Sequence, residues 1–180
     1  MSMWLPTKVF LTRGLGRHKE KLVSFEIALR DAGIAPYNLV RVSSIFPPHC
    51  RLVTRQAGLR LLKPGQILFV VLSENATDEP QRLISASIGL AVPSDPSLYG
   101  YLAEHSSYGL AEKPTGRHAE YLAAEMLATK MGEKLAGPAG GKKTFGVSNG
   151  LSIRTRSLCQ TAPGASGVWT TTLAAAVLIA

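Results

Sequence analysis

Residues 67–108 read ILFVVLSENATDEPQRLISASIGLAVPSDPSLYGYLAEHSSY, and this stretch decides the fold class. Three parts of it, residues 67–73, 83–92 and 99–108, have the apolar or small-residue composition of strands. A proline-containing turn at residues 93–96 separates the last two, and no helical pattern interrupts the series. Strands that follow one another directly favour an α+β protein over a regular alternation of strand and helix.

Helices and further strands flank this segment. Apolar residues at helical spacing predict one helix over residues 18–31, ended by Ala32 and Gly33, and another over residues 116–131. We therefore predict a layered αββα-type sandwich of mixed or antiparallel sheets, with two main helices, in a single domain over residues 1–180. The other expected elements are a strand over 8–12 closed by Gly14 and Gly16, a strand over 37–44, a short helix over 56–62, a solvated loop over 137–143, and strands over 145–159 and 168–179 joined as a hairpin by a turn at 164–167.

Composition and charge restrict the class of protein. The chain has 180 residues, of which 46% are hydrophobic and 18% charged, with a net charge of +8. The basic residues are scattered and not interleaved with aromatics, which disfavours nucleic-acid binding. The apolar run 169–180 is too short to span a membrane and predicts a buried strand. We see no signal peptide, and expect a cytoplasmic protein without a membrane partner and with free thiols at Cys50 and Cys159.

Residues 37–48, YNLVRVSSIFPP, contain the segment that points to chemistry. Ser43 and Ser44 stand together at the predicted end of a strand, before two prolines. Taken alone, such a pair is usually a strand ending in a turn, with the hydroxyls bonded to the local backbone. Only the surrounding sequence gives the pair more weight.

The string NLVRVSSIFPP belongs to a longer similarity. The stretches GRHKEKLVSFEIALRDAGIAPYNLVRVSSIFPPHC (16–50), LKPGQILFVVLSENATDEPQRLISASIGLAVPSDPSLYGYLAEHSSYG (62–109), AEYLAAEMLATKMG (119–132) and GVWTTTLAAAVLIA (167–180) resemble the pyruvoyl-dependent arginine decarboxylases. The resemblance covers most of the chain and is weakest over residues 133–144, which are glycine-rich here.

The resemblance implies a self-processing enzyme. The proenzyme would cleave itself between Ser43 and Ser44, giving a fragment 1–43 and a fragment 44–180 that begins with a pyruvoyl group made from Ser44. Asn38 matches the asparagine that assists processing, although a turn role fits its sequence position too. Glu104 matches the proton donor for decarboxylation and is expected protonated in an apolar or crowded setting; without the resemblance it is a partly exposed strand carboxylate.

The implied substrate is arginine, which would be converted to agmatine and carbon dioxide for polyamine biosynthesis. The carboxylate that binds the guanidinium corresponds to Glu26, where the family has aspartate, so the side chain is one methylene longer. Leu29 would line the pocket or simply pack the helix, and Asp31 would contribute a second carboxylate or end the helix. Two alternatives stay open: the same chemistry on another amino acid such as aspartate or glutamate, and a non-catalytic basic binding module.

The resemblance also implies assembly, because relatives form trimers, often paired into hexamers, with active sites between subunits. No metal is expected, since His18, His49 and His105 lack ligand spacing. Cys50 lacks an identified base and is a poor candidate nucleophile.

Overall fold

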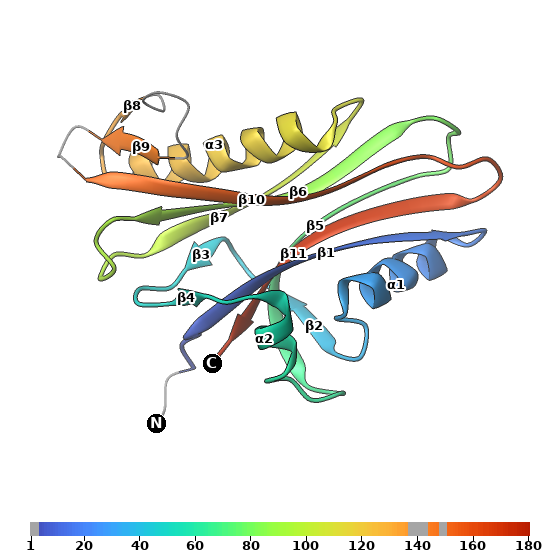
Figure 1. The fold of residues 1–180 in the computed structure, drawn as a ribbon, viewed down its shortest axis with the longest axis horizontal. Helices are drawn as coiled ribbons and strands as arrows, with labels where there is room; N and C mark the ends of the chain where they lie inside the picture. Colours follow the sequence, from blue (N-terminus) through green and yellow to red (C-terminus); the bar gives the residue numbers. More distant parts are fainter. Residues whose placement is uncertain (1–3, 137–143, 148–150) are drawn as a thin grey trace.

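Two β-sheets face each other in this computed structural model, which describes residues 4–136, 144–147 and 151–180. Each sheet carries one long helix on its outer face, so the layers run helix, sheet, sheet, helix (Figure 1). The predicted αββα sandwich with two main helices is confirmed. The helices are α1 (Lys21–Ala32), the short α2 (Arg55–Leu59) and α3 (Glu112–Lys130).

The first sheet is mixed and lies under α1. Its strand order is β2-β5-β11-β1-β4; β2 and β4 join in parallel, whereas β1 and β5 flank β11 antiparallel. Its strands are β1 (Lys8–His18), β2 (Asn38–Arg41), β4 (Arg51–Leu52), β5 (Ile67–Thr77) and β11 (Trp169–Ile179).

The second sheet is antiparallel and lies under α3. Its order is β3-β7-β6-β10-β9-β8. Its strands are β3 (Ile45–Phe46), β6 (Leu83–Pro93), β7 (Gly100–Tyr108), β8 (Leu135–Ala136), β9 (Thr144–Val147) and β10 (Ser152–Pro163).

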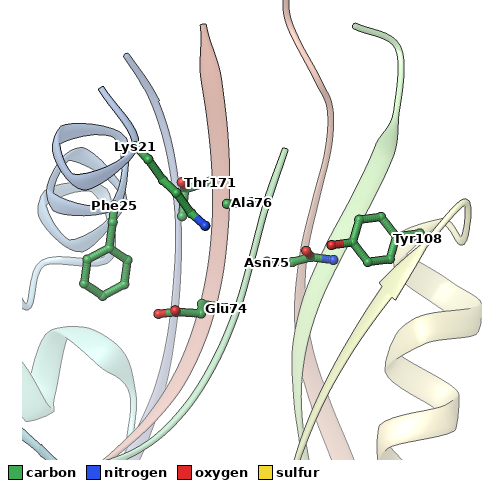
Figure 2. A pocket seen from close by; sticks show the side chains of 7 residues that line it. All are labelled: Lys21, Phe25, Glu74, Asn75, Ala76, Tyr108 and Thr171. Atoms are coloured by element: carbon green, nitrogen blue, oxygen red, sulfur yellow. The ribbon is translucent and has the colours of Figure 1, made fainter. Parts of the chain in front are cut away.

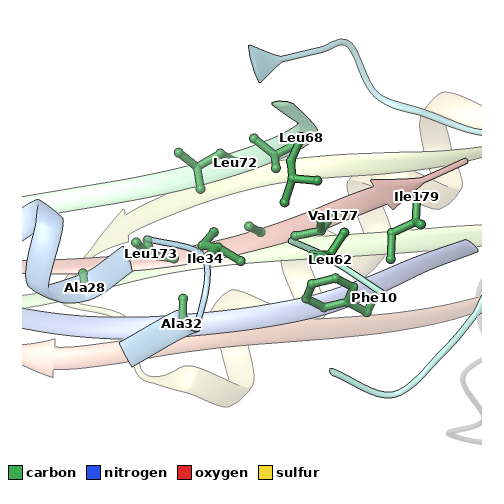
Figure 3. Close-up of a cluster of buried hydrophobic side chains, with 12 residues drawn as sticks. Phe10, Ala28, Ala32, Ile34, Leu62, Leu68, Leu72, Leu173, Val177 and Ile179 are labelled. Atoms are coloured by element: carbon green, nitrogen blue, oxygen red, sulfur yellow. The ribbon is translucent and has the colours of Figure 1, made fainter. Parts of the chain in front are cut away.

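Three apolar clusters fill the three spaces between the four layers. The cluster between α1 and the first sheet is centred on Phe10, Ile34 and Leu173 (Figure 3). A second lies between the sheets around Ile88 and Ala176, and a third lies under α3. The run 169–180 is the central strand β11, buried on both faces as its composition predicts. Among the described residues, no helix is both long and apolar enough to cross a membrane.

Gly14 and Gly16 do not close the first strand, contrary to the prediction. β1 continues through both to His18, because α1 packs directly on them. A Cβ atom at Gly16 would lie 1.9 Å from the carbonyl oxygen of Ser24, and one at Gly14 would lie 2.0 Å from that of Ala28. The glycines therefore admit the helix and do not mark a turn.

The predicted C-terminal hairpin is also wrong. β10 pairs with β6 and β9 in the second sheet, whereas β11 lies between β1 and β5 in the first, so the turn at residues 164–167 joins two sheets. The strand predicted over residues 145–159 is divided between β9 and β10. The loop predicted over residues 137–143 lies outside the described residues.

The strand predicted over residues 37–44 ends early. β2 stops at Arg41, and the chain then leaves the first sheet and enters the second as β3 at Ile45. Residues 42–44 thus form the crossing between the two sheets, and the Ser43–Ser44 bond lies within it.

Candidate active site

Hydrogen bonds to both sheets hold the crossing segment. On one side, the backbone N–H of Val42 donates to the carbonyl oxygen of Val70 on β5, at 3.0 Å. On the other, Ile45 and Phe46 pair with β7, and the Phe46 ring is buried between the sheets. The backbone around Ser44 is therefore fixed at both ends, which suits a bond that must be attacked in one defined geometry.

Ser44 lies beside Glu104. The Ser44 hydroxyl donates to Glu104 Oε2 at 3.4 Å, and the Leu102 N–H donates to the Ser44 carbonyl oxygen at 2.7 Å. Glu104 is two residues beyond Leu102 on β7, where alternate side chains share a face. Two residues that are 60 positions apart and that the sequence proposed for one site are thus brought together.

Side chains from neighbouring strands fix the position of β7. Ser73 on β5 and Ser87 on β6 both donate to the carbonyl oxygen of His105, at 2.9 and 3.0 Å, and Asn75 donates to that of Ser107 at 3.0 Å. These bonds tie the backbone next to Glu104 to both sheets. These bonds were not predicted from the sequence, although polar residues at alternate positions of a buried strand were a signal.

Asn38 does not reach Ser44 within the chain. Its side-chain amide donates to the carbonyl oxygen of Gly65 at 2.9 Å, and its backbone N–H donates to Gln66. It lies at the start of β2, so the extended strand alone separates it from Arg41 by about 10 Å.

The three proposed substrate-binding residues lie on or at the end of α1, away from the serines. Glu26 pairs with Arg30 one turn later, and Leu29 packs on the apolar cluster under the helix. The Asp31 carboxylate accepts a hydrogen bond at 2.9 Å from the backbone N–H of Leu15, so this donor on β1 has a partner. No hydrogen bond or ion pair joins these three residues to Ser44.

Glu104 is exposed in the single chain, contrary to the apolar or crowded setting that was expected. The thiol of Cys50 is partly buried, and this burial raises its pKa to about 11. The thiol is therefore protonated at neutral pH, which disfavours Cys50 as a nucleophile. Cys50 and Cys159 are both free thiols, as predicted.

A recess of about 240 Å³ lies along the edge of β5, lined by α1 residues Lys21 and Phe25 and by Glu74 of the strand (Figure 2). The Glu74 carboxylate is already paired, since it lies 2.6 Å from the guanidinium of Arg41. The ammonium of Lys21 lies over the Trp169 ring. With a paired acid and a cation in its wall, the recess does not suit a guanidinium within one chain.

Comparison with known proteins supports what the geometry indicates. Residues 8–180 match the family described as pyruvoyl-dependent arginine decarboxylase. A probable pyruvoyl-dependent arginine decarboxylase of Chlorobium limicola is 50% identical over 178 residues, which cover 98% of both chains. Pyruvoyl-dependent arginine decarboxylases of Thermoplasma volcanium and Methanosarcina acetivorans are each 49% identical, covering 99% and 97% of both chains. The chain with the Ser44–Glu104 pair therefore belongs to the pyruvoyl-dependent arginine decarboxylase family.

Proposed function

We propose that this protein decarboxylates arginine to agmatine and carbon dioxide, using a pyruvoyl group that it makes by cleaving itself between Ser43 and Ser44. The products would be the fragments 1–43 and 44–180. The observation that supports this most is the contact between the Ser44 hydroxyl and the Glu104 carboxylate, at a peptide bond held between two sheets. The residues around Ser44 fit the requirements of a group built from that serine.

Self-cleavage needs a base for the serine hydroxyl, and Glu104 occupies that place. The proton of Ser44 Oγ passes to Glu104 as Oγ attacks the carbonyl carbon of Ser43. The C–N bond breaks, Glu104 returns the proton to the Ser44 nitrogen, and an ester joins the two residues. Loss of the Ser44 Cα proton then breaks the Cβ–Oγ bond and releases Ser43 as a carboxylate. An oxygen from water then replaces the former backbone nitrogen of Ser44 on its Cα, and that nitrogen leaves as ammonia.

In decarboxylation, the pyruvoyl ketone supplies the electron sink that carbon dioxide loss requires. The chain's own residues do the remaining work. Leu102 keeps the carbonyl oxygen of residue 44 in place through its N–H, at 2.7 Å. Glu104, two residues after Leu102 on β7, delivers a proton to the substrate carbon that has lost its carboxylate.

A second copy of the chain completes the site in this proposal. On one chain Ser44 is half-buried and Glu104 is exposed, while Glu26, Leu29 and Asn38 lie elsewhere. A neighbouring chain that presents its α1 and β2 would cover Glu104 and bring these residues to it. Trimers, paired into hexamers, are the assembly expected for such a shared site.

Glu26 has the geometry to bind a guanidinium. The Nε–H of Arg30 donates to Glu26 Oε1 at 2.8 Å, while Oε2 is enclosed and accepts no hydrogen bond, although it lies 2.7 Å from the same nitrogen. An exposed pair of this kind contributes only about 0.5 kcal/mol, so Arg30 is readily displaced by a substrate guanidinium. Asp31 is occupied by Leu15 and has no role in this proposal.

Aspartate and glutamate, and a non-catalytic binding role, are less favoured. The acidic substrates would bring a second carboxylate against Glu26, which repels it. The family match and the relatives' names also favour arginine. Agmatine production would supply polyamine biosynthesis, and the two free thiols support the expected cytoplasmic location.

Carbon dioxide release from a panel of amino acids tests the substrate. Purified protein is assayed with arginine, lysine, aspartate and glutamate, alone and as the Glu26→Gln variant. We expect release from arginine, with KM raised in the variant because the guanidinium loses its ionic partner. Release from aspartate or glutamate with none from arginine would overturn the substrate assignment while leaving self-cleavage intact.

A further inference from the structure

We infer that Ser73, on β5, is a positioning residue for self-cleavage, because its side chain fixes the second sheet against the first beside the crossing segment. Ser73 acts through the backbone of β7, to which its hydroxyl donates at 2.9 Å. The inference rests on the proposed function, since it concerns the cleavage of the Ser43–Ser44 bond. It goes beyond that function by assigning a task to a side chain outside the reacting groups.

The crossing segment is attached to a different sheet at each end. Before the bond that would break, the N–H of Val42 donates to the carbonyl oxygen of Val70 on β5, at 3.0 Å. After it, the carbonyl oxygen of Ser44 accepts a hydrogen bond from the N–H of Leu102 on β7, at 2.7 Å. A movement of β7 relative to β5 would therefore move Ser44 relative to the carbonyl carbon that it attacks.

Ser73 joins these same two strands close to both attachment points. Its hydroxyl donates to the carbonyl oxygen of His105. Ser73 lies three residues after Val70 on β5, and His105 lies three residues after Leu102 on β7. The link is thus about 10 Å along each strand from the place where the crossing segment is attached. The two attachments and the Ser73 bond close a frame that has the crossing segment as one side.

The Ser73 link is buried and directional. Only 4% of the Ser73 surface is exposed, so its hydroxyl is largely protected from competition by water. The apolar cluster between the sheets stabilises their contact without fixing a direction, whereas a hydrogen bond restricts both a distance and an angle. Asn75 adds a second bond of this kind to the carbonyl oxygen of Ser107, and it lies on the side of β5 that faces the second sheet (Figure 2).

The first step of self-cleavage depends on the geometry that this frame holds. Ser44 Oγ must lie within about 3 to 3.5 Å of the carbonyl carbon of residue 43 and approach it in line with the reacting orbitals. Ser44 and Glu104 are held by β7, whereas the chain before Ser43 is held by β5. Ser73 takes no proton and bears no charge in this step. It keeps the nucleophile and its target in register.

Two serines that donate to one oxygen provide the test. Ser87, on β6, donates to the same carbonyl oxygen of His105 at 3.0 Å, but β6 and β7 belong to one sheet. Ser73→Ala and Ser87→Ala each remove one buried hydroxyl and leave the other, so neither variant leaves this oxygen without a partner. Only Ser73→Ala removes a link between the sheets. Cleavage of the full chain is followed by intact mass from the start of synthesis.

We expect Ser73→Ala to slow the appearance of fragments 1–43 and 44–180 by about 10-fold, since a misplacement of about 1 Å can cost about 100-fold and the Asn75 bond limits the shift. Ser87→Ala should slow cleavage much less, because β6 and β7 stay paired along their ladder. Equal slowing by the two variants, or none by Ser73→Ala, would overturn the inference. If the unmodified chain stays whole, the proposed self-cleavage itself fails.

Two further measurements separate positioning from a loss of stability. In the Ser44→Ala background, which should stay whole, the two alanine variants should lower the urea midpoint by similar amounts, because each loses one buried hydrogen bond. Ser73→Thr keeps the hydroxyl and should recover most of the cleavage rate that Ser73→Ala loses. A threonine variant as slow as the alanine variant, or cleavage rates that follow the urea midpoints, would leave Ser73 a structural role only.

Discussion

In the mechanism that we propose, Glu104 has two tasks that require opposite protonation states. To start self-cleavage it accepts the proton of Ser44 Oγ, for which an ionised carboxylate in water is suitable, and in the single chain its side chain is exposed. To finish decarboxylation it must donate a proton, for which a covered carboxylate is better. A partner chain that covers Glu104 would therefore favour the second task over the first.

Glu104→Gln should slow self-cleavage by a factor of about 100 to 10,000, because the amide cannot accept the serine proton. The rate is measured as the growth of the two fragments on a denaturing gel. Glu79→Gln is the matched control, since Glu79 is exposed and pairs with Arg82 in its surface turn. A Glu104→Gln chain that matures as fast as this control would remove Glu104 from the cleavage step.

His105 should make the protein less stable in acid. Burial, together with the nearby His118 ring, lowers the pKa of His105 from its ordinary value of 6.5. Below that pH the unfolded chain binds a proton that the folded chain does not, so the free energy of unfolding falls as pH drops. Urea midpoints at pH 7.5 and 5.5 should differ less in His105→Gln than in the unchanged chain, and an equal difference in both would contradict this role of His105.

At the scale of single residues, the sequence indicated the side chains of the candidate site but not the backbone N–H groups beside them. Ser44 and Glu104 are recognisable by type and surrounding string, and the structure places them 3.4 Å apart. The N–H groups of Val42 and Leu102 have no sequence signature, because every residue except proline carries one. Asn38 lies six positions before Ser44 in the sequence, but its side-chain amide donates to Gly65 at the far end of β2, a contact that the sequence does not indicate.

At the scale of elements, close contact between β1 and α1 positions the helix that carries Glu26. Two glycines on β1 let the helix backbone approach the strand directly. Composition predicted the helix and the neighbouring strand but assigned the glycines to a turn. A glycine in a strand and a glycine in a turn look alike in sequence, and only the packing of α1 distinguishes them.

Gly16→Ala should destabilise the fold by about 3 kcal/mol, because the new methyl group meets the Ser24 backbone and the helix must move. The free energy of unfolding from urea titration measures the effect. Gly146→Ala is the matched control on β9, where the nearest described atom to a new Cβ would be the Cβ of Ala136, at 4.0 Å. Similar losses for both variants would contradict the proposed role of close helix packing.

The crossing between sheets could not be read from the sequence either. Residues 37–44 keep the alternating pattern of one strand, and nothing in their composition marks Arg41 as its end. The parallel pairing of β2 with β5 ends there because the chain turns toward β7, and that direction depends on Phe46 being buried between the sheets. The sequence predicted the strands over 83–92 and 99–108 nearly to their ends, whereas the strand predicted over 67–73 continues to Thr77.

At the scale of the whole molecule, our proposal is that one chain carries only part of the site. Ser44 and Glu104 lie together on the crossing and β7, while Glu26 lies on α1 over the other sheet. Our proposal of a shared site predicts that two inactive variants can restore each other when their defects lie on opposite sides of the interface.

Ser44→Ala mixed with Glu26→Ala, by unfolding and refolding together, should regain decarboxylation. Random assortment gives about a quarter of interfaces an intact Ser44 from one chain and an intact Glu26 from its neighbour. Ser44→Ala mixed with Glu104→Ala is the control and should stay inactive, because those two residues come from the same chain. Activity in both mixtures, or in neither, would contradict a site shared in this way.

The intact mass of the purified protein tests the central claim most directly. We expect two species, residues 1–43 and residues 44–180, with the larger one lighter by one ammonia than hydrolysis of the same bond would leave. The Ser44→Ala variant should remain a single chain. A single full-length mass for the unchanged protein after prolonged incubation, or a break at any other bond, would contradict self-cleavage between Ser43 and Ser44.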